Sequence, residues 1–160
     1  MRKGGFIMTF DDVVGTLGKR LGVEIVAKDG NAVVSIDEME IVMQEVEAIG
    51  GFCLLGEIGE APPSEEKDVM AASLAANHLF QGTGGATISR DSVSGKFFLC
   101  RYERLDYLDA EKAFEMLERF VDTLDIWHRT FENFRSEEAE NADSEDFDTQ
   151  MNWIYLRKVS

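Results

Sequence analysis

The sequence predicts an α+β fold with one twisted antiparallel sheet, in the order α-β-β-β-α-β-β-α. Two observations predict this fold. Apolar residues recur at helical spacing in three segments and at strand spacing in five others. The strand runs are also joined by links of hairpin length, which favours antiparallel pairing. No internal repeat is visible, and 160 residues are expected to form a single main domain.

The first element is a helix over 9–22. Thr9 is suited to cap its N-terminus, Asp12 follows at the spacing of a capping box, and Gly22 is suited to end it. The apolar residues lie at helical spacing and form one stripe, made of Phe10, Val13, Val14, Leu17 and Leu21.

Three strands follow, over 32–36, 38–47 and 52–58. Turn signals separate them, an Asp-Gly-Asn run at 29–31 and a Gly-Gly pair at 50–51. In the second strand, apolar residues alternate so that one face is apolar and the other mixed, which is typical of a sheet covered by helices on one side. The three strands are therefore expected to form an antiparallel meander.

A second helix is expected over 65–80, capped by Ser64, after a Pro-Pro pair that ends the preceding strand. Its alanine-rich middle favours close helix packing. A hairpin follows, with strands over 86–91 and 96–102. The second of these is apolar on both sides, which predicts that both of its faces are covered.

The last long element is a helix over 109–134, with Asp109 as its N-cap and two apolar stripes. The chain then becomes strongly acidic. We expect a main domain over 1–135, a mobile acidic linker over 136–148 and an apolar tail over 149–160. The tail is expected to be a strand or a docking peptide that occupies a sheet edge or a groove, or alternatively an extra core strand.

Composition excludes several classes of protein. The formal net charge is −15, from 16 basic and 31 acidic residues, and it opposes binding to nucleic acid or to an anionic membrane. Two cysteines make no disulfide framework, and neither a signal peptide nor a membrane span is recognisable. A cytoplasmic setting is the expectation.

No residue pattern predicts catalysis, a cofactor or a metal site. His78 and His128 lack partners at metal-ligand spacing, and Cys53 and Cys100 lie within apolar strands. The glycine-rich run at 82–85 lacks the Lys-Ser/Thr ending of a phosphate loop and precedes a strand rather than a helix. The protein is therefore not expected to be an enzyme.

The remaining anomaly is a surplus of apolar faces, which invites association. One reading is a plain homodimer. The other is a dimer that also offers grooves to an extended segment of another protein.

Several local patterns resemble the class I type III secretion chaperones, the family that includes the chaperone of the translocated intimin receptor. The resemblance covers about residues 9–134. It rests on the first helix, the third strand with the Pro pair, the Leu-Ala-Ala-Asn run ending at Asn77, the Gly-Gly-Ala-Thr-Ile run at 84–88 and the last helix up to Trp127.

The resemblance implies a cytoplasmic homodimer that binds the N-terminal region of a secreted effector in extended form. It assigns the first helix and first three strands to the effector, with candidate residues Val13, Leu17, Val33, Ile41, Met43 and Leu54. It assigns the second helix and last two strands to the dimer contact, with candidate residues Leu74, Phe97 and Leu99. A dimeric regulatory or scaffold module that acts on folded partners is the alternative.

Overall fold

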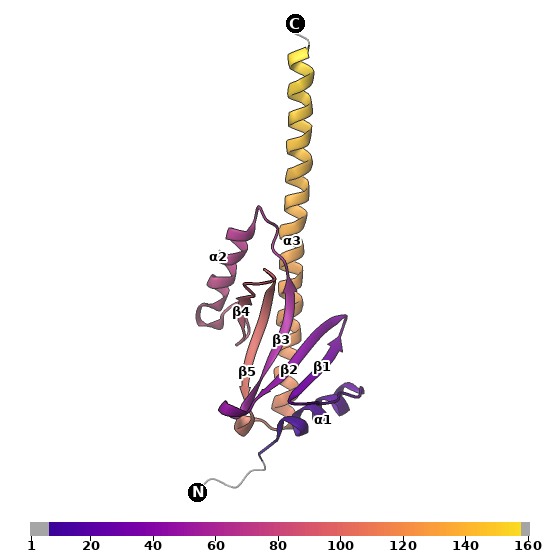
Figure 1. Cartoon of the computed structure of the whole chain (residues 1–160), viewed down its shortest axis with the longest axis vertical. Coiled ribbons are helices and arrows are strands. Elements are labelled where there is room, and N and C mark those ends of the chain that lie inside the picture. The colour runs from indigo at the N-terminus through magenta and orange to yellow at the C-terminus, as the bar shows by residue number, and fades with distance from the viewer. Residues whose placement is uncertain (1–6, 158–160) are drawn as a thin grey trace.

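The computed structural model describes the backbone of residues 7–157 and the side chains of residues 7–136. Over that range the elements follow the predicted order (Figure 1). The helices are α1 (Phe10–Leu21), α2 (Glu66–Asn77) and α3 (Ala110–Arg157). The strands are β1 (Asn31–Ile36), β2 (Met39–Val46), β3 (Gly51–Gly59), β4 (Thr87–Arg90) and β5 (Phe97–Arg104).

The five strands form one antiparallel sheet in the order β1-β2-β3-β5-β4. The first three strands form the predicted meander, and β1 and β4 are the two edges. The turn between β1 and β2 is two residues long, and Asp37 and Glu38 both have positive φ, which matches the twist of a tight hairpin.

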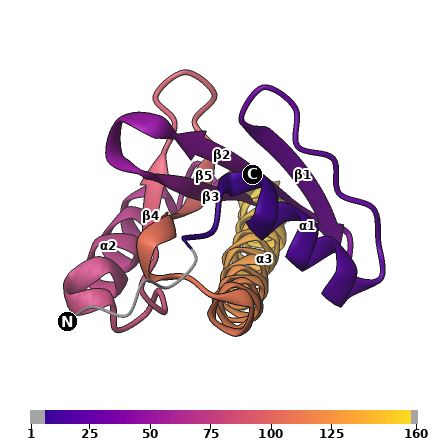
Figure 2. The same cartoon turned by 90° about the horizontal axis from the view of Figure 1, so that it is seen from below.

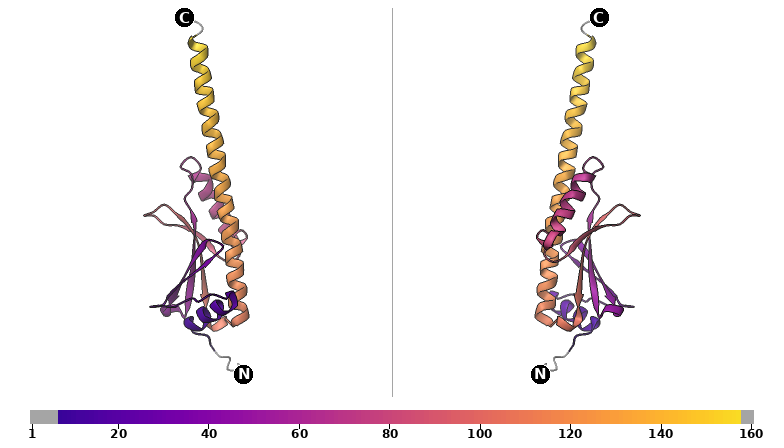
Figure 3. Two further views of the ribbon diagram at one scale, coloured as in Figure 1. Left: turned by 90° about the vertical axis from the view of Figure 1, so that its right-hand side faces the viewer. Right: turned by 90° about the vertical axis from the view of Figure 1, so that its left-hand side faces the viewer.

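All three helices lie on the same face of the sheet (Figures 2 and 3). The strand residues pointing to that face are buried and make up the sheet side of the core: Ala32, Val34, Met39, Ile41, Met43, Phe52, Leu54, Ile58, Ile88, Phe97 and Leu99. The opposite face carries no helix, and Phe98 and Cys100 of β5 are only partly buried there. The expectation that β5 is covered on both faces is therefore wrong for this single chain.

Side-chain caps begin two of the helices as predicted. Thr9 and Asp12 form a complete capping box on α1, and Gly22 ends that helix in the left-handed conformation. Asp109 accepts a hydrogen bond of 2.9 Å from the backbone N–H of Lys112 at the start of α3. Helix α2 begins one residue later than predicted, since its N-cap residue is Glu65 and not Ser64, and the Glu65 side chain makes no cap hydrogen bond.

Helix α3 crosses the middle of the sheet over β3. Gly56 of β3 makes this close approach possible, since a Cβ there would lie 2.5 Å from a methyl carbon of buried Leu124. Farther along α3, the indole N–H of Trp127 donates a hydrogen bond of 2.9 Å to the carbonyl of Gly82. This bond fixes the loop between α2 and β4 against the same helix.

The backbone over 136–157 is helical and continues α3 to Arg157, beyond the predicted helix end at 134. The division into an acidic linker and an apolar tail remains a prediction. Glutamate and alanine, which are frequent at the start of this segment, have high helix propensity, and this outweighs the repulsion between carboxylates. Figure 1 shows the continued helix projecting past the sheet. The last three residues lie outside the described part of the chain, and the docking of the tail remains a prediction.

Two glycines offer a matched test of the packing of β3 against β5. A Cβ at Gly51 would lie 2.2 Å from the backbone oxygen of Glu103, whereas a Cβ at Gly15 would meet nothing within 4 Å. We expect Gly51→Ala to lower the free energy of unfolding by about 2–3 kcal/mol through overpacking. Gly15→Ala should raise it by about 0.5–1 kcal/mol, because alanine favours the helix. Urea denaturation measures both, and equal effects would contradict the close approach of β3 and β5.

Candidate functional site

The outer edge of β1 has backbone groups available for a partner. At its start, Asn31 exchanges two backbone hydrogen bonds with Lys28, of 2.8 and 2.9 Å, on the side away from β2. Because backbone direction alternates along an antiparallel strand, Val33 and Ser35 also direct their N–H and C=O groups to that side. No backbone partner meets these groups within the part of the chain that the structure describes. The β1 edge can therefore accept another strand.

An apolar groove lies beside this edge, between α1, β1 and α3. It has a volume of about 360 Å³. Leu21, Ile36, Phe114, Leu117 and Val121 line it, with the carboxylates of Glu118 and Asp122 at its rim. We call this the β1 groove.

One end of the β1 groove is held by a charged pair. Arg20 of α1 pairs with Glu111 of α3, and its guanidinium lies 5.1 Å from the centre of the Phe114 ring. These contacts join the last turn of α1 to the first turn of α3. They therefore fix the spacing of the two helices that form the walls of the groove.

Most of the residues that the resemblance assigns to effector binding are core residues here. Val13, Leu17, Ile41, Met43 and Leu54 are fully buried between the sheet, α1 and α3, where they support the groove from beneath. Val33 differs, with 49% of its surface exposed on the edge strand. The groove-lining residues Leu21, Phe114 and Val121 belong to the apolar stripes seen in the sequence, but the stripes alone do not tell which members reach the surface.

A second apolar surface lies on α2 and the short turn that follows it. Met70, Leu74, Leu79 and Phe80 are exposed there, Leu74 and Leu79 each to 72%. A groove of about 180 Å³ between α2 and β4 adjoins these residues. We call the four exposed residues the α2 surface.

The turn within the α2 surface is strained. Leu79 and Phe80 have φ of 52° and 56°, a left-handed conformation that bulky residues rarely adopt. Strain of this kind is typical of functional positions. The turn thus presents two large apolar side chains to solvent in an unfavourable backbone conformation.

Of the residues assigned to the dimer contact, only Leu74 lies on this surface. Phe97 and Leu99 are buried, and the Phe97 ring packs edge-on against Phe131 of α3 with the ring centres 5.3 Å apart. Both therefore belong to the core of one protomer.

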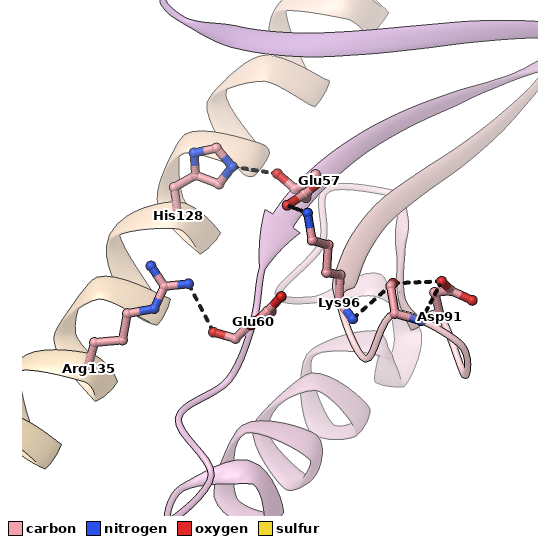
Figure 4. A network of polar contacts seen from close by, with 7 residues as sticks. Glu57, Glu60, Asp91, Lys96, His128 and Arg135 are labelled. Carbon is pink, nitrogen blue, oxygen red and sulfur yellow. Dashed lines mark hydrogen bonds and ion pairs between the residues drawn. The ribbon is translucent and has the colours of Figure 1, made fainter.

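A polar network fixes the other end of the sheet (Figure 4). His128 Nε2 lies 2.6 Å from the carbonyl oxygen of Glu57, and it must carry the proton because a carbonyl only accepts. Lys96 pairs with the Glu57 carboxylate at 2.8 Å, and Arg135 donates to the carbonyl of Glu60 at 3.0 Å. These contacts join the end of β3 to α3 and to the β4–β5 hairpin.

Two observations describe the chemistry of the titratable side chains over residues 7–136. Burial raises the pKa of the Cys100 thiol, whose sulfur lies 3.1 Å from the Ser89 hydroxyl, and a protonated thiol is a poor nucleophile. Among the described residues, no group of three or more His, Cys, Asp or Glu side chains could hold a metal ion. None of the helices described is long and apolar enough to span a bilayer.

Comparison with known proteins gives a family match and several similar folds. Residues 13–128 match the sequence profile of the Tir chaperone protein (CesT) family. No curated protein sequence matches the chain.

Three solved structures have similar folds. A chain of the HopA1–SchA chaperone–effector complex has a TM-score of 0.60 at 18% identity, over 76% of this chain and 91% of that chain. A chain of the ExsC–ExsE complex has a TM-score of 0.63 at 15% identity, over 74% and 90%. A chain of the heterodimeric ExoU–SpcU complex from the type III secretion system of Pseudomonas aeruginosa has 0.59 at 22%, over 76% and 95%.

The β4–β5 hairpin gives a pH-dependent prediction. Asp91 accepts hydrogen bonds from the Ser94 hydroxyl (2.6 Å), the Ser94 N–H and the Val93 N–H, and these bonds hold its pKa below the ordinary 3.8. The carboxylate therefore stabilises the fold above pH 3.8, and this contribution is lost as the pH falls through the lowered value.

Asp91→Asn should consequently lower the urea midpoint of unfolding at pH 7. The difference in midpoint between this variant and the parent protein should shrink below pH 3.8. Glu40→Gln, the same change of charge on an exposed residue of β2, serves as the control and should shift the midpoint little. A difference for Asp91→Asn that stays constant down to pH 2 would contradict the role of the carboxylate.

Proposed function

The chain belongs to the Tir chaperone protein (CesT) family, and on this basis we propose that it is a type III secretion chaperone. It binds the N-terminal region of a secreted effector in extended form and keeps that region competent for export. It acts in the cytoplasm and without catalysis. The similar folds in the HopA1–SchA and ExoU–SpcU complexes support an effector as the partner.

The observation that carries the proposal is the open β1 edge beside the β1 groove. An extended peptide can add to a sheet edge through backbone hydrogen bonds, and its alternate side chains can enter neighbouring pockets. Here Val33 and Ser35 supply the free backbone groups, and the β1 groove supplies an apolar pocket next to the end of the same strand. Backbone pairing explains how one surface accepts an unfolded segment with few demands on its sequence.

The homodimer is assigned to the α2 surface. It is apolar, lies on a different element from the β1 groove and contains the strained Leu79–Phe80 turn. In a two-fold contact each exposed side chain is buried twice, once in each protomer. Of the three predicted dimer residues, Leu74 is therefore the one whose side chain is exposed in the protomer and can contact a second copy.

Ser35→Pro tests the β1 edge directly. Proline removes the N–H of Ser35, which points away from β2, so the ladder to β2 keeps its hydrogen bonds while an added strand loses one. Co-expression with the N-terminal region of an effector encoded beside this gene should give a soluble complex of two chaperones per segment. We expect Ser35→Pro to weaken that complex about tenfold or more, measured by isothermal titration calorimetry.

Two variants control for other effects. Ser35→Ala removes the same hydroxyl but keeps the N–H, and it should bind as the parent does. Val34→Pro removes an N–H that points to β2, and it should destabilise the sheet itself. Unchanged binding by a folded Ser35→Pro protein would rule out strand addition at β1.

Leu74→Glu tests the α2 surface. Because Leu74 is exposed in the protomer, the substitution should leave the fold intact but place a charge in the dimer contact, where two copies would meet the same patch. Light scattering should show the mass of a single chain, 18.0 kDa, instead of twice that value. Ile126→Glu, at an exposed position on α3, should remain dimeric; a dimeric Leu74→Glu protein would place the contact elsewhere.

A further inference from the structure

The second edge of the sheet, β4, also has backbone groups that point away from the sheet. Strand β4 pairs with β5 on one side only, with Ile88 opposite Leu99. An edge strand with free N–H and C=O groups is a template for pairing with any extended chain. Whether these groups on β4 already have hydrogen-bond partners therefore decides whether an added strand can pair with one edge of the sheet or with both.

Asn77, the last residue of α2, occupies the position of a neighbouring strand at Ile88. Its side-chain oxygen accepts a hydrogen bond of 2.8 Å from the Ile88 N–H. Its side-chain nitrogen donates a hydrogen bond of 3.0 Å to the Ile88 carbonyl. A carboxamide offers the same donor and acceptor pair as a peptide group, so Asn77 satisfies both groups that an added strand would use.

Thr83 satisfies both backbone groups of Ala86, two residues before Ile88. The N–H of Ala86 donates to the Thr83 carbonyl at 2.9 Å, and the Thr83 hydroxyl donates to the Ala86 carbonyl at 2.6 Å. Thr83 is fully buried, so this arrangement is part of the packed fold. At the other end of β4, Arg90 pairs with Glu66 of α2 at 2.7 Å.

The two edges are therefore unlike. The side chain of Asn77 satisfies both outward backbone groups of Ile88, and Thr83 satisfies those of Ala86 with its hydroxyl and its backbone carbonyl. In contrast, Val33 and Ser35 on β1 meet no backbone partner among the described residues. A contact that only stabilises the fold would satisfy these backbone groups and have no further effect. Because Asn77 and Thr83 take the positions that a neighbouring strand would occupy, they also prevent a second extended chain from pairing with β4.

We propose that Asn77 and Thr83 close the β4 edge, so that strand addition is directed to β1 alone. Asn77 contributes most to this choice between the two edges, because its side chain satisfies both backbone groups of Ile88. This inference rests on the proposed function insofar as the added strand belongs to an effector, but closure itself is a property of the free protein. It also predicts that dimerisation through the α2 surface does not join two sheets through β4.

Amide hydrogen exchange of the full-length protein, followed by NMR without any effector, tests whether the β4 edge is closed. In the parent protein the Ile88 amide should exchange slowly, as buried strand amides do, while the Val33 and Ser35 amides exchange fast. Asn77→Ala should accelerate exchange at Ile88 about tenfold or more, and Asn77→Asp, which keeps an accepting oxygen, should have a smaller effect. Fast exchange at Ile88 in the parent protein would overturn the proposal.

Self-association separates edge closure from simple stabilisation. An opened β4 edge should let Asn77→Ala protomers pair edge to edge, giving assemblies larger than those of the parent in sedimentation velocity. The Ile88 amide should regain protection as concentration rises. Ser73→Ala is the matched control, because it removes a side-chain hydrogen bond to the Val69 carbonyl within α2 and leaves the hydrogen bonds between Asn77 and Ile88 in place.

If Asn77→Ala accelerates exchange but associates no more than Ser73→Ala does, Asn77 only stabilises the fold and the proposal is wrong. Thr83→Val, which keeps the shape of the side chain but removes the hydroxyl, provides a second variant if Asn77→Ala does not fold. It should also increase association, and failure to do so would count against closure. Neither measurement uses an effector, so loss of binding in Ser35→Pro and loss of closure in Asn77→Ala are independent results.

Discussion

The close approach of α3 to β3 is the constraint on which the rest of the structure depends. Gly56 lacks a side chain at the point where Leu124 packs, and this sets α3 over the central strand. With the middle of the sheet covered in this way, α1 and α2 are left to cover the β1 and β4 ends of the same face (Figure 2). The β1 groove exists because α1 and α3 do not meet over Ile36, and the polar contacts of His128 and Arg135 maintain that alignment along α3.

Much of the fold follows from local signals in the sequence. The capping box at Thr9, the left-handed Gly22 and the alternation of Met39, Ile41 and Met43 each depend on neighbours along the chain, and each is observed as predicted. The end of α3 lies beyond the predicted one, because the helix propensity of glutamate and alanine outweighs the repulsion between carboxylates. The start of α2 differs from the prediction by one residue, because Ser64 is a good cap by residue type but the helix has Glu65 as its N-cap.

The candidate site was less predictable, for a physical reason. An apolar stripe indicates that its residues pack against another apolar surface. It does not tell whether that surface is the interior of the same protomer or belongs to another chain. Leu17 and Val121 belong to equally regular stripes, yet Leu17 is buried and Val121 lines the β1 groove. The pairing of Asn77 with Ile88 joins residues eleven positions apart through side chain and backbone, and nothing in the periodicity indicates it.

The continued α3 has a geometric consequence. From Ser136 to Arg157 the helix rises by about 30 Å, since each residue adds about 1.5 Å. The last described turn of α3, at Arg157, therefore lies about 30 Å beyond Ser136 along the helix axis. A fluorophore attached at this part of the helix would lie well away from the β1 groove and the α2 surface of the same protomer.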